Sequence, residues 1–142
     1  MAKRVLVPVD DSERREQAVE LTFDLLPGGT VVLLRVINPA EVGFSSEEVL
    51  PSFSEGWYEE ERTRAEEAFD EIEELAAGHD VSVERHIELG RPAGTILDAV
   101  TELDVDHVVM GSRGRRGVSR ILLGSVAEAV VRRSDVPVTV AR

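Results

Sequence analysis

The sequence predicts an α/β fold with a doubly wound parallel sheet, and two observations support this. Short runs rich in β-branched residues alternate with longer segments whose apolar residues recur about every 3.6 positions. This alternation is typical of strands followed by helices, and right-handed crossovers then place helices on both faces of a parallel sheet. The chain of 142 residues has the length of one domain with one core. We therefore expect a single domain over residues 1–142.

Five runs predict the strands. They cover residues 5–9, 31–37, 81–87, 107–110 and 136–141, and each is rich in valine or isoleucine. Pro8 stands near the end of the first run, where it removes one donor from the strand ladder. Such a departure from the strand rules suits a place where the backbone leaves the sheet to meet a ligand.

Four segments with helical periodicity follow the first four strands. They cover residues 18–26, 65–75, 96–100 and 126–130, and the second helix is expected to open at Trp57 and Tyr58. Ten acidic residues between Glu55 and Glu74 are typical of a solvated helix face. Residues 38–56, which contain prolines, glycines and serines, predict a long loop insertion before this helix. Two roles remain open for this loop, a lid or contact surface and an insertion without a special role.

The charge balance excludes several classes of partner. Asp and Glu total 28 against 16 Lys and Arg, and the formal net charge of −12 disfavours duplex nucleic acid and anionic membranes. No apolar run approaches the roughly 18 residues that span a bilayer, and the apolar stretch near the N-terminus is too short for a signal peptide. The absence of cysteine removes disulfides, thiolate nucleophiles and Cys-based zinc sites. We expect a cytoplasmic protein that binds no nucleic acid and inserts into no membrane.

The cations are almost all arginine, since Lys3 is the single lysine. An acidic surface poor in lysine favours a halophilic protein, adapted to high intracellular salt. A GC-rich coding bias produces the same preference for arginine, and both explanations remain open.

The most unusual stretch is GSRGRRGVSRILLGS, residues 111–125, which connects a predicted strand to a predicted helix. Between residues 111 and 133 there are six arginines and one carboxylate, whereas the rest of the chain carries ten basic and 27 acidic residues. Glycines permit positive φ and close backbone approach, and the N–H groups at the start of a helix attract anions. Because α/β folds bind ligands at the carboxyl ends of parallel strands, a phosphate chain fits this position.

A purely structural interpretation explains part of the same stretch. Ser125 and Glu128 have the spacing of a capping box, and Gly124 can be the turn residue before it. The arginines can pair with acidic residues elsewhere on the surface. From the spacing alone both interpretations remain open, because a glycine pattern after a strand is a weak signal.

The glycines nevertheless follow a known pattern. Gly111, Gly114, Gly124 and Ser125 match G-x-x-G-x(9)-G-[ST], and the sequence thereby resembles the nucleotide-binding members of the universal stress protein family. The likeness covers nearly the whole chain, including the opening VLVPVDDS, the turn GRPA at residues 90–93 and the closing run LLGSVAEAVVRRSDVPVTVAR. It implies a Rossmann-like, ATP-binding stress-response domain with five strands in the order 3-2-1-4-5. It also implies a homodimer formed through the last strand, residues 136–141.

The resemblance further implies a role for each motif. The adenosine side of ATP is expected at Pro8, Val9, Asp10 and Val36. The ribose and α-phosphate side is expected at Met110, Gly111, Arg113 and Gly114, and the outer phosphates at Gly124, Ser125 and Val126. Helix capping, together with Asp11 and Ser12, is the alternative role for Asp10. Mg²⁺ is expected only as the companion of ATP, because the sequence shows no dedicated carboxylate cage.

The single lysine argues against two other phosphate-handling folds. A receiver domain needs a lysine after its fifth strand and a Walker-type NTPase needs one before its Ser or Thr, but Lys3 precedes the first strand. Between Gly111 and Ala127 there is no Asp, Glu or His, so no catalytic residue is predicted. We expect a protein that binds ATP and hydrolyses it slowly if at all.

A nucleotide-independent dimerising module is the alternative function. In that case the final strand pairs between two copies of the chain, and the glycine-rich stretch is only a structural turn.

Overall fold

The sheet has five parallel strands in the order β3-β2-β1-β4-β5, which confirms the predicted topology. The computed structural model describes residues 3–10, 15–42, 51–111 and 124–141. The strands are β1 Arg4–Pro8, β2 Thr30–Ile37, β3 Ser82–Leu89, β4 His107–Gly111 and β5 Val138–Ala141. The helices are α1 Arg15–Leu25, α2 Pro51–Ala76, α3 Pro92–Glu102 and α4 Ser125–Arg133, with a short 3-10 helix η1, Pro39–Val42.

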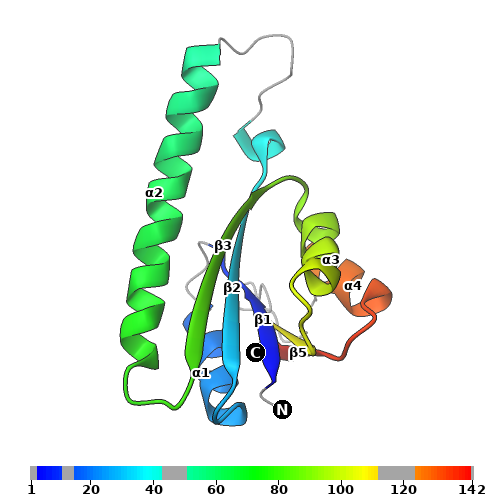
Figure 1. Cartoon of the computed structure of the whole chain (residues 1–142). Coiled ribbons are helices and arrows are strands. Elements are labelled where there is room, and N and C mark those ends of the chain that lie inside the picture. Colours follow the sequence, from blue (N-terminus) through cyan, green and yellow to red (C-terminus); the bar gives the residue numbers. More distant parts are fainter. Residues whose placement is uncertain (1–2, 11–14, 43–50, 112–123, 142) are drawn as a thin grey trace, which may run out of the picture.

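Helices cover both faces of the sheet (Figure 1). Because successive residues of a strand point to opposite faces, the continuous apolar runs of β1, β2 and β4 supply two separate cores. Val7, Leu33 and Val109 pack with α1 and α2 on one face, where Phe69 and Ile72 of α2 are fully buried. Leu6 and Val108 pack with α3 and α4 on the other face.

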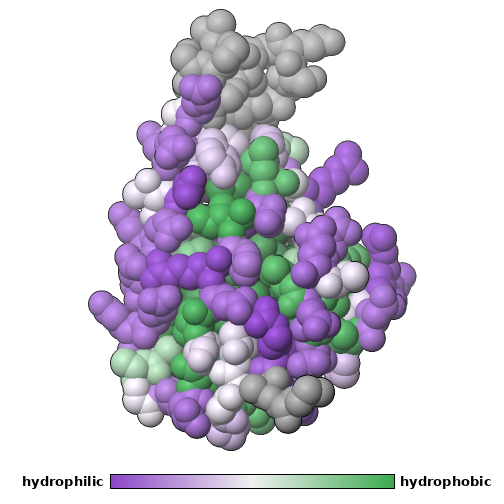
Figure 2. Space-filling model, in the orientation of Figure 1, coloured by the Kyte–Doolittle hydropathy of each residue, from purple (hydrophilic) through white to green (hydrophobic). Residues whose placement is uncertain are grey.

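The surface agrees with the acidic composition. Figure 2 shows hydrophilic side chains over most of the visible face, with apolar side chains in smaller patches between them. Leu25 and Leu75, which continue the predicted helical stripes, are 62% and 37% exposed, so the apolar pattern overestimates the core at the ends of α1 and α2. Within the described ranges, none of the helices combines the length and the apolarity needed to cross a membrane.

The loop predicted over residues 38–56 is shorter than expected. η1 occupies residues 39–42, and α2 begins at Pro51, six residues before the predicted start at Trp57. Proline has a suitable φ for the first turn of a helix and lacks only an N–H that would have no partner there. Gly56 then lies inside a helix of 26 residues, which tolerates its cost of about 1 kcal/mol relative to alanine. As a result, α2 begins well beyond the carboxyl edge of the sheet (Figure 1).

β5 is also shorter than the predicted strand 136–141. The N–H of Val136 donates to Oγ of Ser134 at 3.1 Å, and Pro137 has no N–H to donate. The ladder with β4 therefore starts at Val138, which pairs with Val108.

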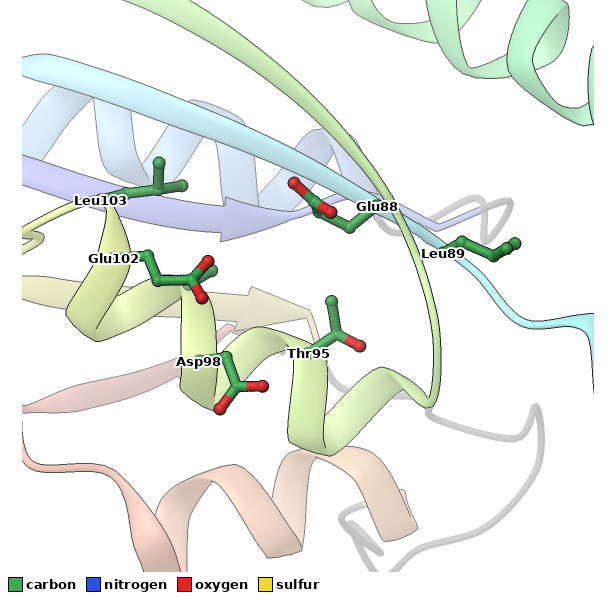
Figure 3. A pocket seen from close by; sticks show the side chains of 7 residues that line it. Glu88, Leu89, Thr95, Asp98, Glu102 and Leu103 are labelled. Atoms are coloured by element: carbon green, nitrogen blue, oxygen red, sulfur yellow. The ribbon is translucent and has the colours of Figure 1, made fainter.

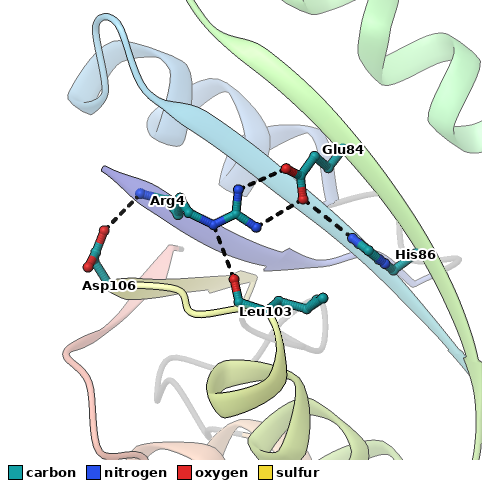
Figure 4. Close-up of polar contacts among 5 residues, drawn as sticks. All are labelled: Arg4, Glu84, His86, Leu103 and Asp106. Carbon is teal, nitrogen blue, oxygen red and sulfur yellow. Dashed lines mark hydrogen bonds and ion pairs between the residues drawn. The ribbon is translucent and has the colours of Figure 1, made fainter. Parts of the chain in front are cut away.

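Arg4 joins three segments at the amino end of the sheet (Figure 4). Its guanidinium crosses β2 and donates two hydrogen bonds to the carboxylate of Glu84 on β3, at 2.8 and 2.9 Å. Its Nε donates to the carbonyl of Leu103 at 3.1 Å, and its backbone N–H donates to Asp106 at 2.9 Å. The Arg4 hydrogen bonds, with a smaller effect of His86, lower the pKa of Glu84 to about 2.

This pairing predicts an acid-sensitive contribution to stability. Because the folded-state pKa of Glu84 lies below its ordinary value of 4.5, the stabilisation is present above pH 4.5 and is lost as the pH falls toward 2. Glu84→Gln is expected to lower the free energy of unfolding near neutral pH by about 1–2 kcal/mol, a value reduced for solvent screening of a half-exposed pair. Urea denaturation of both proteins between pH 2 and 7 measures the difference, which should vanish at the acid end. Glu88→Gln, on the exposed end of the same strand, is the matched control. Parallel pH profiles of wild type and Glu84→Gln would contradict this assignment.

Candidate functional site

The predicted site lies where the connections of the sheet change direction. β1 and β4 are neighbours, with Leu6 opposite Val108, while the chain continues from β1 toward β2 and β3 on one side and from β4 toward β5 on the other. Such a switch point leaves a crevice outside the carboxyl ends of the two central strands. The structure brings the residues that end β1 and the residues that end β4 to this edge.

The end of β1 contributes backbone more than side chains. Pro8 is the last residue of the strand, and the N–H of Val9 donates to the carbonyl of Leu34 at 2.8 Å. The Val9 side chain is 4% exposed and packs in the core under α1 and α2. Asp10 follows the strand and is half-buried.

The end of β4 is similar. Met110 is 6% exposed and packs in the core under α3 and α4, so its backbone is the part available to a ligand. Gly111 ends the strand and pairs with Ala141 of β5. Val36 lies on β2, on the opposite side of β1 from β4, and packs half-buried against the same core as Met110. Arg113 and Gly114, the other two predicted residues of this part, lie outside the described residues.

The start of α4 differs from the predicted capping box. Gly124 is the N-cap residue, Ser125 is the first residue of the helix, and among the described residues no side chain caps it. Glu128 is therefore one position too far along to reach back to the cap. Its N–H donates to the carbonyl of Gly124 at 2.9 Å, and its carboxylate pairs with Arg132 at 2.8 Å. The N–H groups of residues 125–127 have no i−4 carbonyl partner within the helix, which leaves them suited to an anion.

The described glycines of the motif do not use the positive φ that glycine permits. In the described part of the chain, the glycines with positive φ are Gly28, Gly78 and Gly90, whereas Gly124 has φ −61° and ψ 159°. Any residue can adopt this extended conformation. The backbone at Gly124 thus does not require glycine.

One residue near this edge was not predicted. Arg35 interrupts the apolar strand β2, and its side chain is only 11% exposed. Its Nη1 lies 3.4 Å from the carbonyl oxygen of Val9, and its Nη2 lies 3.6 Å from a carboxylate oxygen of Glu61 on α2. The signal in the sequence was a single charge inside the run VVLLRVI, which otherwise predicts a strand buried on both faces.

The described histidines have structural contacts. Nε2 of His107 lies 2.7 Å from Oγ1 of Thr139 across β4 and β5, and the ring of His79 packs on Phe23 with centroids 5.1 Å apart. His86 lies 3.5 Å from the carboxylate of Glu84. Each of the three histidine rings thus contacts a neighbouring side chain of the fold.

A hollow of about 160 Å³ lies between β3 and α3 (Figure 3). The side chains of Glu88, Thr95, Asp98 and Glu102 line it, so it is acidic and unsuited to a phosphate. Over the described ranges, no group of three or more His, Asp or Glu is arranged to hold a metal ion.

These features define a doubly wound α/β domain whose sheet has a switch point between β1 and β4. The whole chain, residues 1–142, matches the model of the universal stress protein family. The chain belongs to this family.

Known proteins support the same assignment. Universal stress protein MJ0577 from Methanocaldococcus jannaschii is 30% identical over 159 residues, which cover 100% of this chain and 96% of the relative. A solved structure of MJ0577 matches with a TM-score of 0.82 at 31% identity, covering 99% of this chain and 96% of that chain. Two further solved structures share the fold at 20% identity. One is a universal stress protein in complex with cAMP, with a TM-score of 0.67 and coverage of 99% and 97%. The other is the Archaeoglobus fulgidus protein in complex with dAMP, with a TM-score of 0.68 and coverage of 99% and 98%.

Proposed function

We propose that this chain is a regulatory protein that binds ATP at the carboxyl edge of the sheet, between the ends of β1 and β4 and the start of α4. The observation that carries the proposal is the N-cap of α4, where Gly124 has a backbone conformation open to any residue and yet is glycine. A missing Cβ at that place gives a phosphate access to the first N–H groups of the helix.

The other predicted residues take their roles from this placement. The adenosine side meets Pro8, Val9, Asp10 and Val36, the ribose and α-phosphate meet Met110, Gly111, Arg113 and Gly114, and the outer phosphates meet Gly124, Ser125 and Val126. Because Val9 and Met110 bury their side chains in the two cores, their contribution is a fixed backbone. The complexes of related folds with cAMP and dAMP support the ability of the fold to hold an adenine nucleotide. At 20% identity this support concerns the fold rather than these residues.

We expect Mg²⁺ to enter with the nucleotide. Its ligands would be phosphate oxygens and water, as is usual for Mg²⁺ bound with ATP. The described residues offer no metal cluster of their own for it.

The proposed activity is binding, with slow hydrolysis at most. Rapid phosphoryl transfer uses a positioned base and metal-holding carboxylates, and the stretch from Gly111 to Ala127 contains no Asp, Glu or His. Release of phosphate by the purified protein faster than about one turnover per minute, which is still slow for an enzyme, would overturn this part of the proposal.

The test is a valine at Gly124. We expect Gly124→Val to weaken ATP binding at least about 100-fold, since the side chain blocks the path of the phosphates, while the extended backbone accepts valine without strain. Isothermal titration with ATP measures the affinity, and circular dichroism and the melting temperature check the fold. Gly94→Val, in the first turn of α3, is the matched control, because a Cβ at Gly94 meets no atom within 4 Å among the described residues.

Two results would contradict the proposal. The first is a wild-type protein that releases no adenine nucleotide on denaturation and shows no binding in titration with ATP, which would mean that it has no ATP site. A Gly124→Val protein that binds ATP like wild type places the phosphates elsewhere. Gly114→Val provides a second variant in the same motif and is also expected to lose binding.

A nucleotide-independent dimerising module is the second candidate, and the position of β5 favours it. In the described part of the chain β5 pairs with β4 alone, and Val138, Thr139 and Val140 are half-exposed at this edge of the sheet. An edge strand rich in β-branched residues can pair with its copy in a homodimer. Sedimentation equilibrium with and without ATP separates the two candidate functions. A protein that forms a dimer but binds no ATP supports the dimerising module and not the ATP-binding protein.

A further inference from the structure

Arg35 and Glu61 form an ion pair in the interior between the sheet and α2. Their side chains are 11% and 16% exposed, and Nη2 of Arg35 lies 3.6 Å from Oε2 of Glu61. Arg64 on the outer side of α2 approaches the same carboxylate at 3.4 Å, but its side chain is 64% exposed. Glu61 therefore has one inner and one outer cation, and the inner one comes from the sheet.

The position of Glu61 on α2 makes a carboxylate unexpected there. Ala65, Ala68 and Phe69 of α2 are buried in the core, and Glu61 lies one turn before Ala65 on the same face of the helix. An apolar residue would continue this stripe. Placing a pair of charges there costs desolvation, and an apolar pair of similar size is often equally stable or more stable. Fold stability alone therefore does not account for the pair.

The second contact of Arg35 leads to the proposed nucleotide site. Its Nη1 donates to the carbonyl oxygen of Val9 at 3.4 Å, and this carbonyl belongs to the peptide that joins Val9 to Asp10. The N–H of Val9 is held by the carbonyl of Leu34 at 2.8 Å. Both backbone polar groups of Val9, the residue before Asp10, thus bond to β2. The N–H bonds to the backbone of β2, and the carbonyl bonds to the Arg35 side chain.

We propose that Arg35 is a positioning residue of the nucleotide site, which orients the Val9–Asp10 peptide and transmits nucleotide binding to α2 through Glu61. This inference rests on the proposed function. The guanidinium suits the role because its planar fork can donate to a carbonyl and a carboxylate at once, which an ammonium group does less well. The element at the other end of the connection is α2, whose N-terminal part extends beyond the carboxyl edge of the sheet (Figure 1).

The coupling has a consequence in both directions. If nucleotide binding fixes the Val9–Asp10 peptide, it also favours the Arg35 conformation that pairs with Glu61. By linkage, a partner that holds α2 in this position raises the affinity for the nucleotide by the same factor. α2 is then the element that responds to whether the site holds a nucleotide.

The decisive variant replaces both charges by apolar residues, as Arg35→Met with Glu61→Leu. If the pair is only structural, ATP affinity stays at the wild-type value. If Arg35 positions the site, affinity falls about tenfold while the melting temperature without ATP stays the same or rises. Arg64→Met is the matched control, since it removes the exposed cation of the same carboxylate, and it is expected to leave affinity unchanged. Arg35→Lys is expected to recover part of the affinity.

Hydrogen exchange supplies the second measurement. ATP is expected to slow amide exchange at residues 58–62 of α2 in wild type and in Arg64→Met, but not in the doubly substituted protein. Wild-type protein that binds no ATP overturns the proposed function and this inference together. Wild-type affinity in the doubly substituted protein, with ATP binding otherwise intact, overturns this inference alone.

Discussion

Phe69→Ala is expected to lower the free energy of unfolding by about 3–5 kcal/mol, the usual cost of truncating a fully buried aromatic residue. Phe69 has no exposed surface and fills the core between α2 and the sheet. The loss combines the transfer of the ring from the interior to water with the cavity left behind. The free energy of unfolding of a typical domain is about 5–15 kcal/mol, so such a loss removes a large part of it.

Urea denaturation of the two proteins, followed by circular dichroism, measures this difference. Leu75→Ala on the same helix is the control, because Leu75 is 37% exposed and its truncation is expected to cost about 1 kcal/mol or less. Equal losses in the two variants would mean that α2 contributes little to the core, contrary to the structure.

Arg85→Met carries the second-largest expected effect on stability, about 2 kcal/mol at low salt. Arg85 on β3 donates to Glu73 at 2.8 Å, to Asp70 at 2.7 Å and to Glu66 at 3.0 Å, all on α2, and its guanidinium lies 5.8 Å from the centroid of the Phe69 ring. These carboxylates raise the pKa of Arg85, and Arg85 in turn lowers the pKa of Glu73. Its removal leaves three carboxylates on one helix face without the cation that joins them, and they then repel one another.

Salt separates this effect from the loss of packing. At 1 M KCl the Debye length is about 3 Å, so the repulsion among the carboxylates and the deficit of Arg85→Met should both shrink. Arg64→Met, which removes a mostly exposed cation from the same helix, is expected to change stability by less than about 0.5 kcal/mol. A deficit that stays constant between low and molar KCl would assign the role of Arg85 to contact with Phe69 rather than to charge.

The local pattern was enough to predict most of the fold. The β-branched runs located the five strands to within a few residues, and the helical stripes located the buried Phe69 and Ile72. The strand order came from the resemblance that the glycine motif and its flanks carry, and the structure confirms it. Of the candidate site, the sequence predicted strand ends at Val9 and Met110, each one residue from the observed ends at Pro8 and Gly111, because a strand end is marked by a local change in pattern.

The errors lie where a local signal has two interpretations. Pro51 was interpreted as part of a loop but begins α2, since proline is compatible with both a loop and the first turn of a helix. Ser125 and Glu128 have the spacing of a capping box, but the helix starts at Ser125 itself, and a shift of one residue removes the motif. Neither shift is visible in the sequence, because the position at which a helix starts depends on how the helix packs.

The ion pairs between β-strands and α2 were not predictable from the sequence either. Arg35 and Glu61 lie on different elements, β2 and α2, and the residues next to each give no sign of the other. The same holds for Arg85 and the three carboxylates that it joins. In the sequence Arg35 is a single charge in an apolar run, and Arg85 stands between Glu84 and His86. The carboxylates are among ten acidic residues between Glu55 and Glu74, which predict only a solvated helix face.

Sequence alone was therefore sufficient for the class of fold, the approximate positions of its elements and the strand ends that form the candidate site. All of these follow from periodicity and from residues close together in the chain. The tertiary structure was needed for the start of α2, the cap of α4 and the connection from Val9 through Arg35 to Glu61. The physical reason is that hydrogen bonds and ion pairs act over a few ångströms, and the packing of α2 on the sheet decides which distant residues come within that range.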